Sequence, residues 1–168
     1  MSKDELLKYY DPMAELSIQY IDMIIDDIKS IVRVVSGDKI LLYVASKNDY
    51  ILVKKAVEII SNNGRIPDLI RSLKSDVPRL GYRMRDLPLI SRQLYEVITK
   101  LPNNLRDYLV KVSVFDEARV LNELSNYIEN RTGLKIVKIL SKDDVESVNG
   151  RIEGKLVIPL KPAIIIKG

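Results

Sequence analysis

The chain has 168 residues, of which 46% are hydrophobic and 30% are charged, a size and composition typical of one folded domain. It contains no histidine and no cysteine, which excludes an imidazole base, a thiolate nucleophile, a disulfide and the usual zinc sites. No glycine-rich phosphate loop, signal peptide or long apolar run is present. We therefore expect a cytoplasmic protein with no catalytic activity of its own, no cofactor, no metal and no membrane partner.

The net charge of +4 is unevenly distributed along the chain. Residues 1–38 carry four basic and eight acidic side chains, whereas residues 64–100 carry eight basic and four acidic ones. Such a distribution suits a module that faces a polyanion with one surface and a protein with another, although it also occurs in proteins with neither partner.

The first predicted element is a long helix over residues 13–36, ended by Ser36-Gly37. Its apolar side chains recur at alternating four- and three-residue steps, which place them along one seam. The seam consists of Ala14, Ile18, Ile21, Ile25, Ile28, Val32 and Val35, widened by Ile24 and Ile31. No second helix of this length is adjacent in the sequence, so we expect the seam to dock back onto the domain or to pair with another copy. Asp22 and Asp26, on the opposite face, are predicted to be solvated rather than to form a metal site.

Strands and helices follow in the first half of the chain. We predict a buried strand at 39–45, a helix capped by Asn48 or Asp49 and ended at 62–64, a short helix from 66 that Pro78 breaks, and a helix from 86 to Pro102.

The second half is predicted to contain a strand-helix-strand unit. Residues 108–114 alternate apolar and polar side chains, the period of a strand with one buried face. A helix from Asp116 to Thr132-Gly133 and a strand at 134–140 complete the unit. Residues 141–155 contain an acidic surface loop and two turn signals, Asn149-Gly150 and Glu153-Gly154, and a last strand covers 163–166. The predicted fold class is α+β, a small mixed β-sheet packed with helices and preceded by one long N-terminal helix.

Basic side chains concentrate between Arg71 and Arg92. Guanidinium groups pair with phosphate and stack on bases, and a tyrosine ring offers a π-face, so this mixture suits structured or single-stranded RNA. The RNA-binding candidates of this segment are Arg71, Lys74, Arg79, Tyr82, Arg83, Arg85 and Arg92. The alternative is that these charges only solvate the loops between helices.

The chain closes on the string Ile158-Pro159-Leu160-Lys161-Pro162-Ala163-Ile164-Ile165-Ile166. This string resembles the Pro-x-Lys-Pro-Ala-Ile ending of leucyl-tRNA synthetases of the archaeal and eukaryotic cytosolic type. The order of elements before it is also similar, and the segment 20–28 resembles the last helix of that family's anticodon-binding bundle. The resemblance therefore covers almost the whole chain.

The resemblance implies two parts, the end of the anticodon-binding bundle at 1–37 and a C-terminal α+β tRNA-binding domain at 38–168. In that family the C-terminal domain is not catalytic and helps to bind leucine tRNA near its corner and long variable arm. The catalytic and editing domains have no counterpart in these residues. The resemblance thus implies either a fragment of a synthetase or a free-standing relative, with leucine tRNA and the rest of a synthetase as partners.

Two further RNA-binding candidates lie near the C-terminus. Lys161 stands between two prolines that stiffen the backbone, and Lys167 is expected to emerge at the edge of the sheet beside the RNA. The alternative is that the last strand is purely structural. A rival hypothesis for the whole chain is a protein-interaction module that docks onto a synthetase, or self-associates, through helix 13–36.

Overall fold

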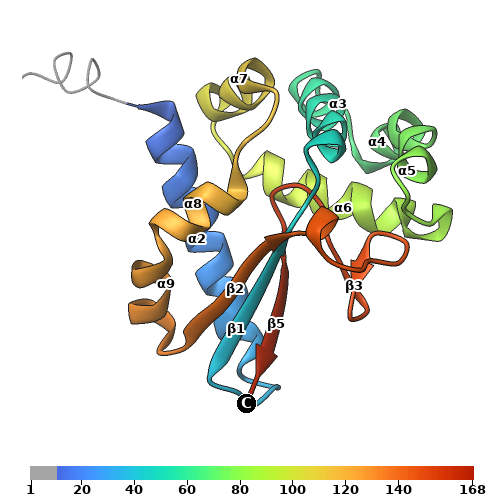
Figure 1. Cartoon of the computed structure of the whole chain (residues 1–168). Coiled ribbons are helices and arrows are strands. Elements are labelled where there is room, and N and C mark those ends of the chain that lie inside the picture. Colours follow the sequence, from blue (N-terminus) through green and yellow to red (C-terminus); the bar gives the residue numbers. More distant parts are fainter. Residues whose placement is uncertain (1–10) are drawn as a thin grey trace, which may run out of the picture.

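The computed structural model describes residues 11–168, and its fold is α+β, as the sequence predicts (Figure 1). The helices are α2 (Pro12–Ile31), α3 (Tyr50–Ser61), α4 (Ile66–Leu73), α5 (Asp76–Arg79), α6 (Leu87–Thr99), α7 (Asn103–Val112), α8 (Glu117–Glu123) and α9 (Ser125–Thr132). The strands are β1 (Lys39–Val44), β2 (Lys135–Ser141), β3 (Arg151–Ile152), β4 (Lys155–Leu156) and β5 (Ala163–Lys167). Three 3₁₀ turns are η1 (Lys47–Asp49), η2 (Met84–Asp86) and η3 (Lys142–Asp144).

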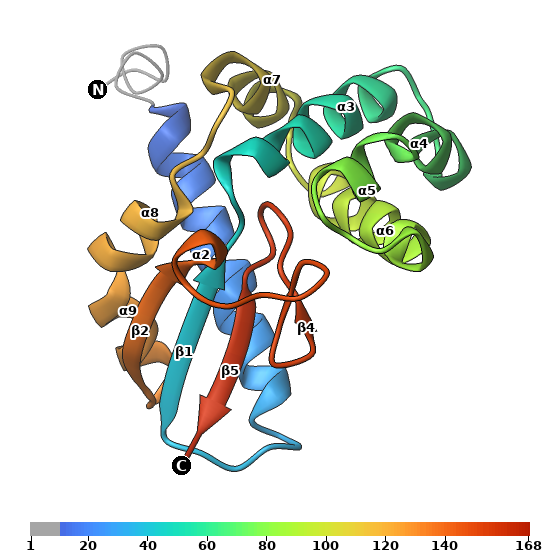
Figure 2. The same cartoon turned by 45° about the vertical axis from the view of Figure 1, so that its right-hand side comes forward.

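A mixed three-stranded sheet in the order β2-β1-β5 forms the centre, with β1 parallel to β2 and antiparallel to β5. The side chains of β1 alternate between its two faces. Ile40, Leu42 and Val44 pack in the main core with α2, which lies behind the sheet in Figure 2. Tyr43 and Ala45 face the other way and form a second apolar cluster with residues of the β3–β4 hairpin region. We call these the inner and the outer face of the sheet.

The predicted long N-terminal helix is present as α2, but its buried face differs from the predicted seam. Asp11 caps the helix, since its Oδ1 accepts a hydrogen bond from the Met13 amide at 3.0 Å. The buried side chains are Leu16, Tyr20, Ile21, Ile24, Ile25 and Ile28. Ala14, Ile18, Val32 and Val35 of the predicted seam are exposed, because the four-residue series beginning at Leu16 carries larger side chains to the core and the helix ends at Ile31.

The apolar face of α2 is covered by its own chain. The Tyr20 ring meets Phe115 edge-on, with ring centroids 5.3 Å apart, and the helix packs against α7 and α9. Of the two expected outcomes, docking back onto the domain is therefore the one observed, and pairing through this face would require α2 to undock.

The predicted strand at 108–114 is wrong, because residues 103–112 form helix α7. Leu105 and Leu109, four residues apart, are buried, whereas Val110 is exposed. The alternation of valines that suggested a strand is therefore incidental, and Leu105 and Leu109 set a helical period. The predicted strand-helix-strand unit loses its first strand for this reason.

Three other expectations differ in detail. The helix predicted from Asp116 to Gly133 is divided at Leu124 into α8 and α9. Pro78 lies within the one-turn helix α5, since α4 has already ended at Leu73. Both predicted turns are present, with positive φ at Asn149 and Gly150 and at Glu153 and Gly154, the pattern of two-residue hairpin turns.

Helices α3 to α6 form a lobe beside the upper end of β1 in Figure 1, and α6 packs against α3 and α4. Their buried side chains belong to the same core as α2 and the inner face of the sheet. Within residues 11–168, no helix is long and apolar enough to cross a membrane.

Candidate nucleic-acid interface

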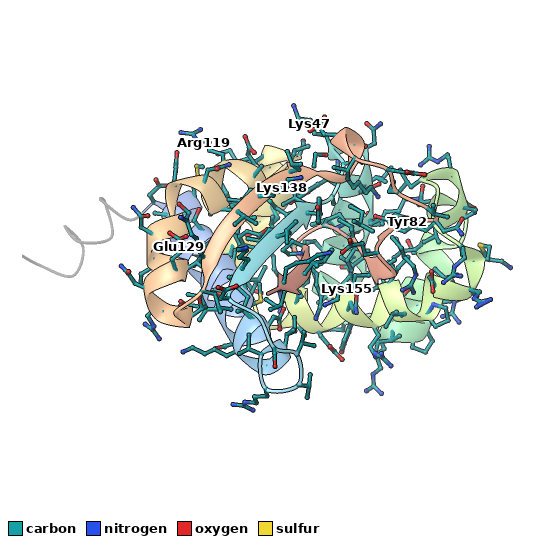
Figure 3. The ribbon with its side chains drawn as sticks, turned by 60° about the horizontal axis from the view of Figure 1, so that its bottom comes forward. Lys47, Tyr82, Arg119, Glu129, Lys138 and Lys155 are labelled. Carbon is teal, nitrogen blue, oxygen red and sulfur yellow. The ribbon has the colours of Figure 1, made fainter. Side chains whose placement is uncertain are left out.

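Tyr82 is not available for stacking on RNA, which corrects its assignment as an RNA-binding residue. The residue is only 3% exposed. Its hydroxyl donates to the carbonyl of Val157 at 2.6 Å and accepts from Lys142 Nζ at 2.8 Å. Burial is the main cause that raises the pKa of this phenol above its ordinary value. Tyr82, labelled in Figure 3, instead anchors the loop before η2 to the C-terminal half of the chain through these hydrogen bonds.

A buried ion pair stands beside Tyr82. Lys142 Nζ lies 2.5 Å from Asp49 Oδ2, and both side chains are less than a tenth exposed. Asp49 occupies the N-cap position of α3, as predicted, but its carboxylate accepts from the Ser46 amide and pairs with Lys142 rather than capping α3. The pair joins η1 to η3, and nothing local in the sequence around Lys142 distinguishes it from a solvated lysine of an acidic loop.

Three of the candidate arginines pair with an aspartate three residues away. Arg71 pairs with Asp68, Arg79 with Asp76 at 2.5 Å, and Arg83 with Asp86 at 3.2 Å. The Arg71 and Arg79 side chains remain 74% and 63% exposed, and Arg83 is one-third exposed. Each guanidinium uses one nitrogen in its pair, so its other N–H groups remain for a phosphate.

The other three cations of this segment have no ion-pair partner within residues 11–168. They are Lys74, at the C-cap of α4, Arg85 in η2 and Arg92 in α6, and all three are exposed. These three cations therefore add to the net positive charge of this segment of the chain. We call the six cations, Arg71, Lys74, Arg79, Arg83, Arg85 and Arg92, the α4–α6 surface.

Sequence reasoning missed Arg151, which extends the α4–α6 surface towards the sheet. Its guanidinium binds Asp86 through Nη2 at 2.9 Å and Nε at 3.3 Å, on the same carboxylate that pairs with Arg83. The hydrogen bonds from Arg151 and then Arg83 keep the pKa of Asp86 below its ordinary value. Arg151 follows the turn at Asn149-Gly150, and only the folded hairpin brings it to Asp86, 65 residues earlier in the chain.

Arg151 also lines a groove of about 370 Å³ between α2, α6 and the C-terminal segment. Lys155 and Lys161 line the same groove, with one acidic residue, Asp27. Burial raises the pKa of Asp27, and the charge of Lys161 opposes this shift. The structure thus brings half-buried Lys161 to the side of α6, next to the predicted basic segment.

Lys167 lies elsewhere. It is the last residue of β5, at the opposite end of that strand from the groove, and its Nζ pairs with Glu153 at 3.2 Å. The predicted RNA-binding cations therefore lie in two places. One is the α4–α6 surface with the groove, and the other is the end of β5 far from the groove.

Three archaeal proteins illustrate the similarity of this chain to known ones. The leucine–tRNA ligase of Pyrobaculum aerophilum is 28% identical over 157 residues, which are 94% of this chain and 15% of the ligase. That of Ignicoccus hospitalis is 29% identical over 98% of this chain and 15% of the ligase. Leucine–tRNA ligase 1 of Saccharolobus solfataricus is 23% identical over 93% and 16%. The chain is similar to one segment of archaeal leucine–tRNA ligases.

The similarity confirms the resemblance seen at the C-terminal string, and its extent is consistent with a C-terminal domain or fragment of such a ligase. The chain spans only 15% to 16% of the length of these leucine–tRNA ligases. No family model matches the chain, and no solved structure matches it significantly.

Among residues 11–168, no cluster of acidic side chains is arranged to hold a metal ion. Asp22 and Asp26 are exposed on α2, as the sequence predicts.

Proposed function

We propose that this domain is a non-catalytic tRNA-binding module of the leucyl-tRNA synthetase type, which contributes to binding leucine tRNA in the cytoplasm. The observation that carries the proposal is the set of exposed cations on the α4–α6 surface, in a chain similar to leucine–tRNA ligases along nearly its whole length. Aminoacylation belongs, in this proposal, to the part of the ligases that the chain does not cover.

The chemistry of the α4–α6 surface suits a folded RNA. Arginine dominates the surface, and its planar fork of N–H donors matches the oxygens of a phosphate. The aspartates paired with three of these arginines hold the guanidinium groups in place without neutralising the whole surface, because Lys74, Arg85 and Arg92 are unpaired within the described residues. Contacts of this kind position an RNA, and they carry no sequence information by themselves.

Lys161 has a role of its own in the proposal, distinct from that of the α4–α6 surface. It lies half-buried beside Arg151 and Lys155, where an RNA held on α6 reaches it. Discrimination of the long variable arm of leucine tRNA from shorter arms, and contact with the corner of the tRNA, are assigned to this groove and the adjoining C-terminal segment.

The test is binding of leucine tRNA to the 168-residue chain at several salt concentrations, measured by fluorescence anisotropy. A variant with Lys74→Ala, Arg85→Ala and Arg92→Ala removes three charges from the α4–α6 surface without leaving an aspartate unpaired. A matched control with Lys29→Ala, Lys54→Ala and Lys111→Ala removes three exposed charges from α2, α3 and α7. We expect the slope of log affinity against log salt to fall by about 2–3 in the first variant only. Equal slopes in both variants, or no binding by the unmodified chain at low salt, would contradict the proposal.

A further inference from the structure

Lysines line up across the outer face of the sheet at one end. Lys39 of β1 is the register partner of Lys135 on β2 and of Lys167 on β5, so one lysine from each strand stands at the same level. Lys138 pairs with Leu41, the next outer-face residue of β1. We call Lys135, Lys39, Lys167 and Lys138 the lysine row.

The alternation of side chains places all four on the outer face. Leu41, Tyr43 and Ala45 of β1 belong to the outer apolar cluster, as do Ala163 and Ile165 of β5. Lys39 and Lys167 each stand two residues from a member of that cluster, and side chains two residues apart share a face. The bulge at Val137 keeps Lys138 in step, because Ile40 pairs with Ile136 and Leu41 with Lys138.

The row brings four positive charges together on one face of the sheet. Paired residues on one face have Cβ atoms roughly 5 Å apart, and like charges there repel. Of the four lysines of the row, only Lys167 forms an ion pair within residues 11–168, with Glu153 at 3.2 Å. Glu129 is the nearby carboxylate of α9, and its Oε2 is engaged by the Ile136 amide at 2.9 Å. A sheet that places like charges together in this way gains stability from an anion that binds across them.

The lysine row is accessible to solvent, and the side chains around it indicate which kind of anion it can bind. All four lysines are exposed, and no helix covers the lower half of the sheet's front face in Figure 2. Figure 3 labels Lys138 on β2. The tyrosine of this face, Tyr43, is 8% exposed, so the face offers no ring on which a base can stack. Lysines alone act as flexible point charges, which suits a sugar–phosphate backbone rather than splayed bases.

Strand β5 connects the row to the site already described. Ala163, at its start, lines the groove that holds Lys161, and Lys167, at its end, belongs to the row. Five residues of extended strand span about 14 Å. The α4–α6 surface lies beyond the groove, on the far side from the C-terminus in both Figure 1 and Figure 2. An anion that contacts both regions must therefore be an extended polyanion.

We propose that the lysine row is a second contact for the phosphate backbone of the tRNA, which reaches along β5 from the α4–α6 surface to this end of the sheet. The proposal rests on the tRNA-binding function proposed above and adds a separate surface to it. It assigns the row to affinity without sequence preference, and it requires an RNA long enough to reach both surfaces.

The test uses the 168-residue chain with Lys39→Ala, Lys135→Ala and Lys138→Ala, which leaves the Lys167–Glu153 pair intact. Leucine tRNA and a short RNA hairpin are the probes, and the Lys29, Lys54 and Lys111 alanine triple is the charge-matched control. We expect the fold loss of tRNA affinity between 50 and 200 mM salt to be roughly 20- to 40-fold smaller in the row variant than in the unmodified chain. The melting temperature should stay the same or rise, because repulsion is removed. The short hairpin, which reaches only one surface, should be affected much less.

The outcomes separate the two proposals. If the row variant binds tRNA like the control while the Lys74, Arg85 and Arg92 variant is weakened, the row proposal is wrong and the tRNA-binding function stands. If the unmodified chain does not bind tRNA at low salt, both proposals fail. Row-dependent binding to vesicles of anionic phospholipid without any effect on tRNA binding would overturn the RNA assignment of the row.

Discussion

A buried carboxylate joins three helices and the C-terminal segment, and it predicts how the stability of this domain depends on pH. Glu117 of α8 is 3% exposed. Its Oε1 accepts from the Tyr20 hydroxyl of α2 at 2.6 Å. Its Oε2 accepts from the Tyr50 hydroxyl of α3 at 2.6 Å and from the Leu160 amide at 3.1 Å. No cation contacts the carboxylate among residues 11–168.

Burial raises the pKa of Glu117 from 4.5 to about 7, and the hydrogen bonds from the two tyrosines and Leu160 oppose this shift. Because the folded state holds the proton to a higher pH than the unfolded state, stability falls as pH rises from about 4.5 to 7. One pKa unit corresponds to about 1.4 kcal/mol, so the free energy of unfolding should decrease by about 3 kcal/mol over this window. The chain has no histidine, so no imidazole titrates in the same range.

Other carboxylates act outside or at the lower end of this window. The hydrogen bond from Arg151 is the main cause that lowers the pKa of Asp86. The stability that Asp86 contributes is therefore lost only as the pH falls below the ordinary pKa of an aspartate. Asp27, whose pKa is raised by burial, adds a slope of the same sign as Glu117. We therefore expect maximum stability near pH 5.

The assay is urea denaturation of the unmodified chain and of Glu117→Gln between pH 4.5 and 8, with Asp27→Asn as the matched control. The glutamine keeps the shape of the side chain and does not titrate. The unmodified chain and Asp27→Asn should lose stability towards pH 8, whereas Glu117→Gln should lose most of that dependence. A flat profile in the unmodified chain, or an unchanged slope in Glu117→Gln, would show that the Glu117 carboxylate does not cause this pH dependence.

Three further substitutions, and Gly154→Ala as a control for one of them, test the interior around Tyr82 by urea denaturation. Lys142→Met leaves the Asp49 carboxylate buried without its partner, so we expect a loss of about 3–5 kcal/mol, and a loss under 1 kcal/mol would contradict the buried pair. Gly150→Ala places a Cβ 2.2 Å from the Tyr82 ring at a φ of 73°, whereas Gly154→Ala, at 79°, meets open space. The first should destabilise by clearly more than the roughly 1–2 kcal/mol that positive φ alone costs, and equal losses would disprove the contact. Tyr82→Phe should lose about 1–3 kcal/mol with tRNA affinity unchanged, and weakened tRNA binding at equal foldedness would restore Tyr82 to the interface.

The sequence predicts elements where one local pattern dominates. The apolar run of β1, the cap at Asp116 and the left-handed Gly133 that ends α9 follow from short-range rules. Prediction from the sequence fails where two patterns compete. In residues 103–112, apolar side chains recur at both two-residue and four-residue spacings. Only packing in the folded core determines that Leu105 and Leu109 are the buried ones.

The candidate site is less accessible to sequence reasoning, because its outcome depends on contacts distant in the chain. Tyr82 resembles an exposed aromatic among arginines, yet its partner Lys142 is 60 residues away. The lysine row is likewise invisible in the sequence, since Lys39 and Lys135 are 96 residues apart and meet only through the strand register. Arg71 and Arg92 lie on exposed helix faces. The basic composition of their segment is enough to identify them as candidates.

The tRNA-binding proposal is tested most directly by the affinity of the 168-residue chain for two tRNAs at fixed, moderate salt. One is leucine tRNA with its long variable arm, and the other is the same tRNA with that arm shortened. We expect both tRNAs to bind measurably through phosphate contacts and the long-arm tRNA to bind more tightly. Lys161→Ala should lose that preference and keep its melting temperature. Failure of the chain to bind either tRNA, even at 50 mM salt, would contradict the tRNA-binding proposal.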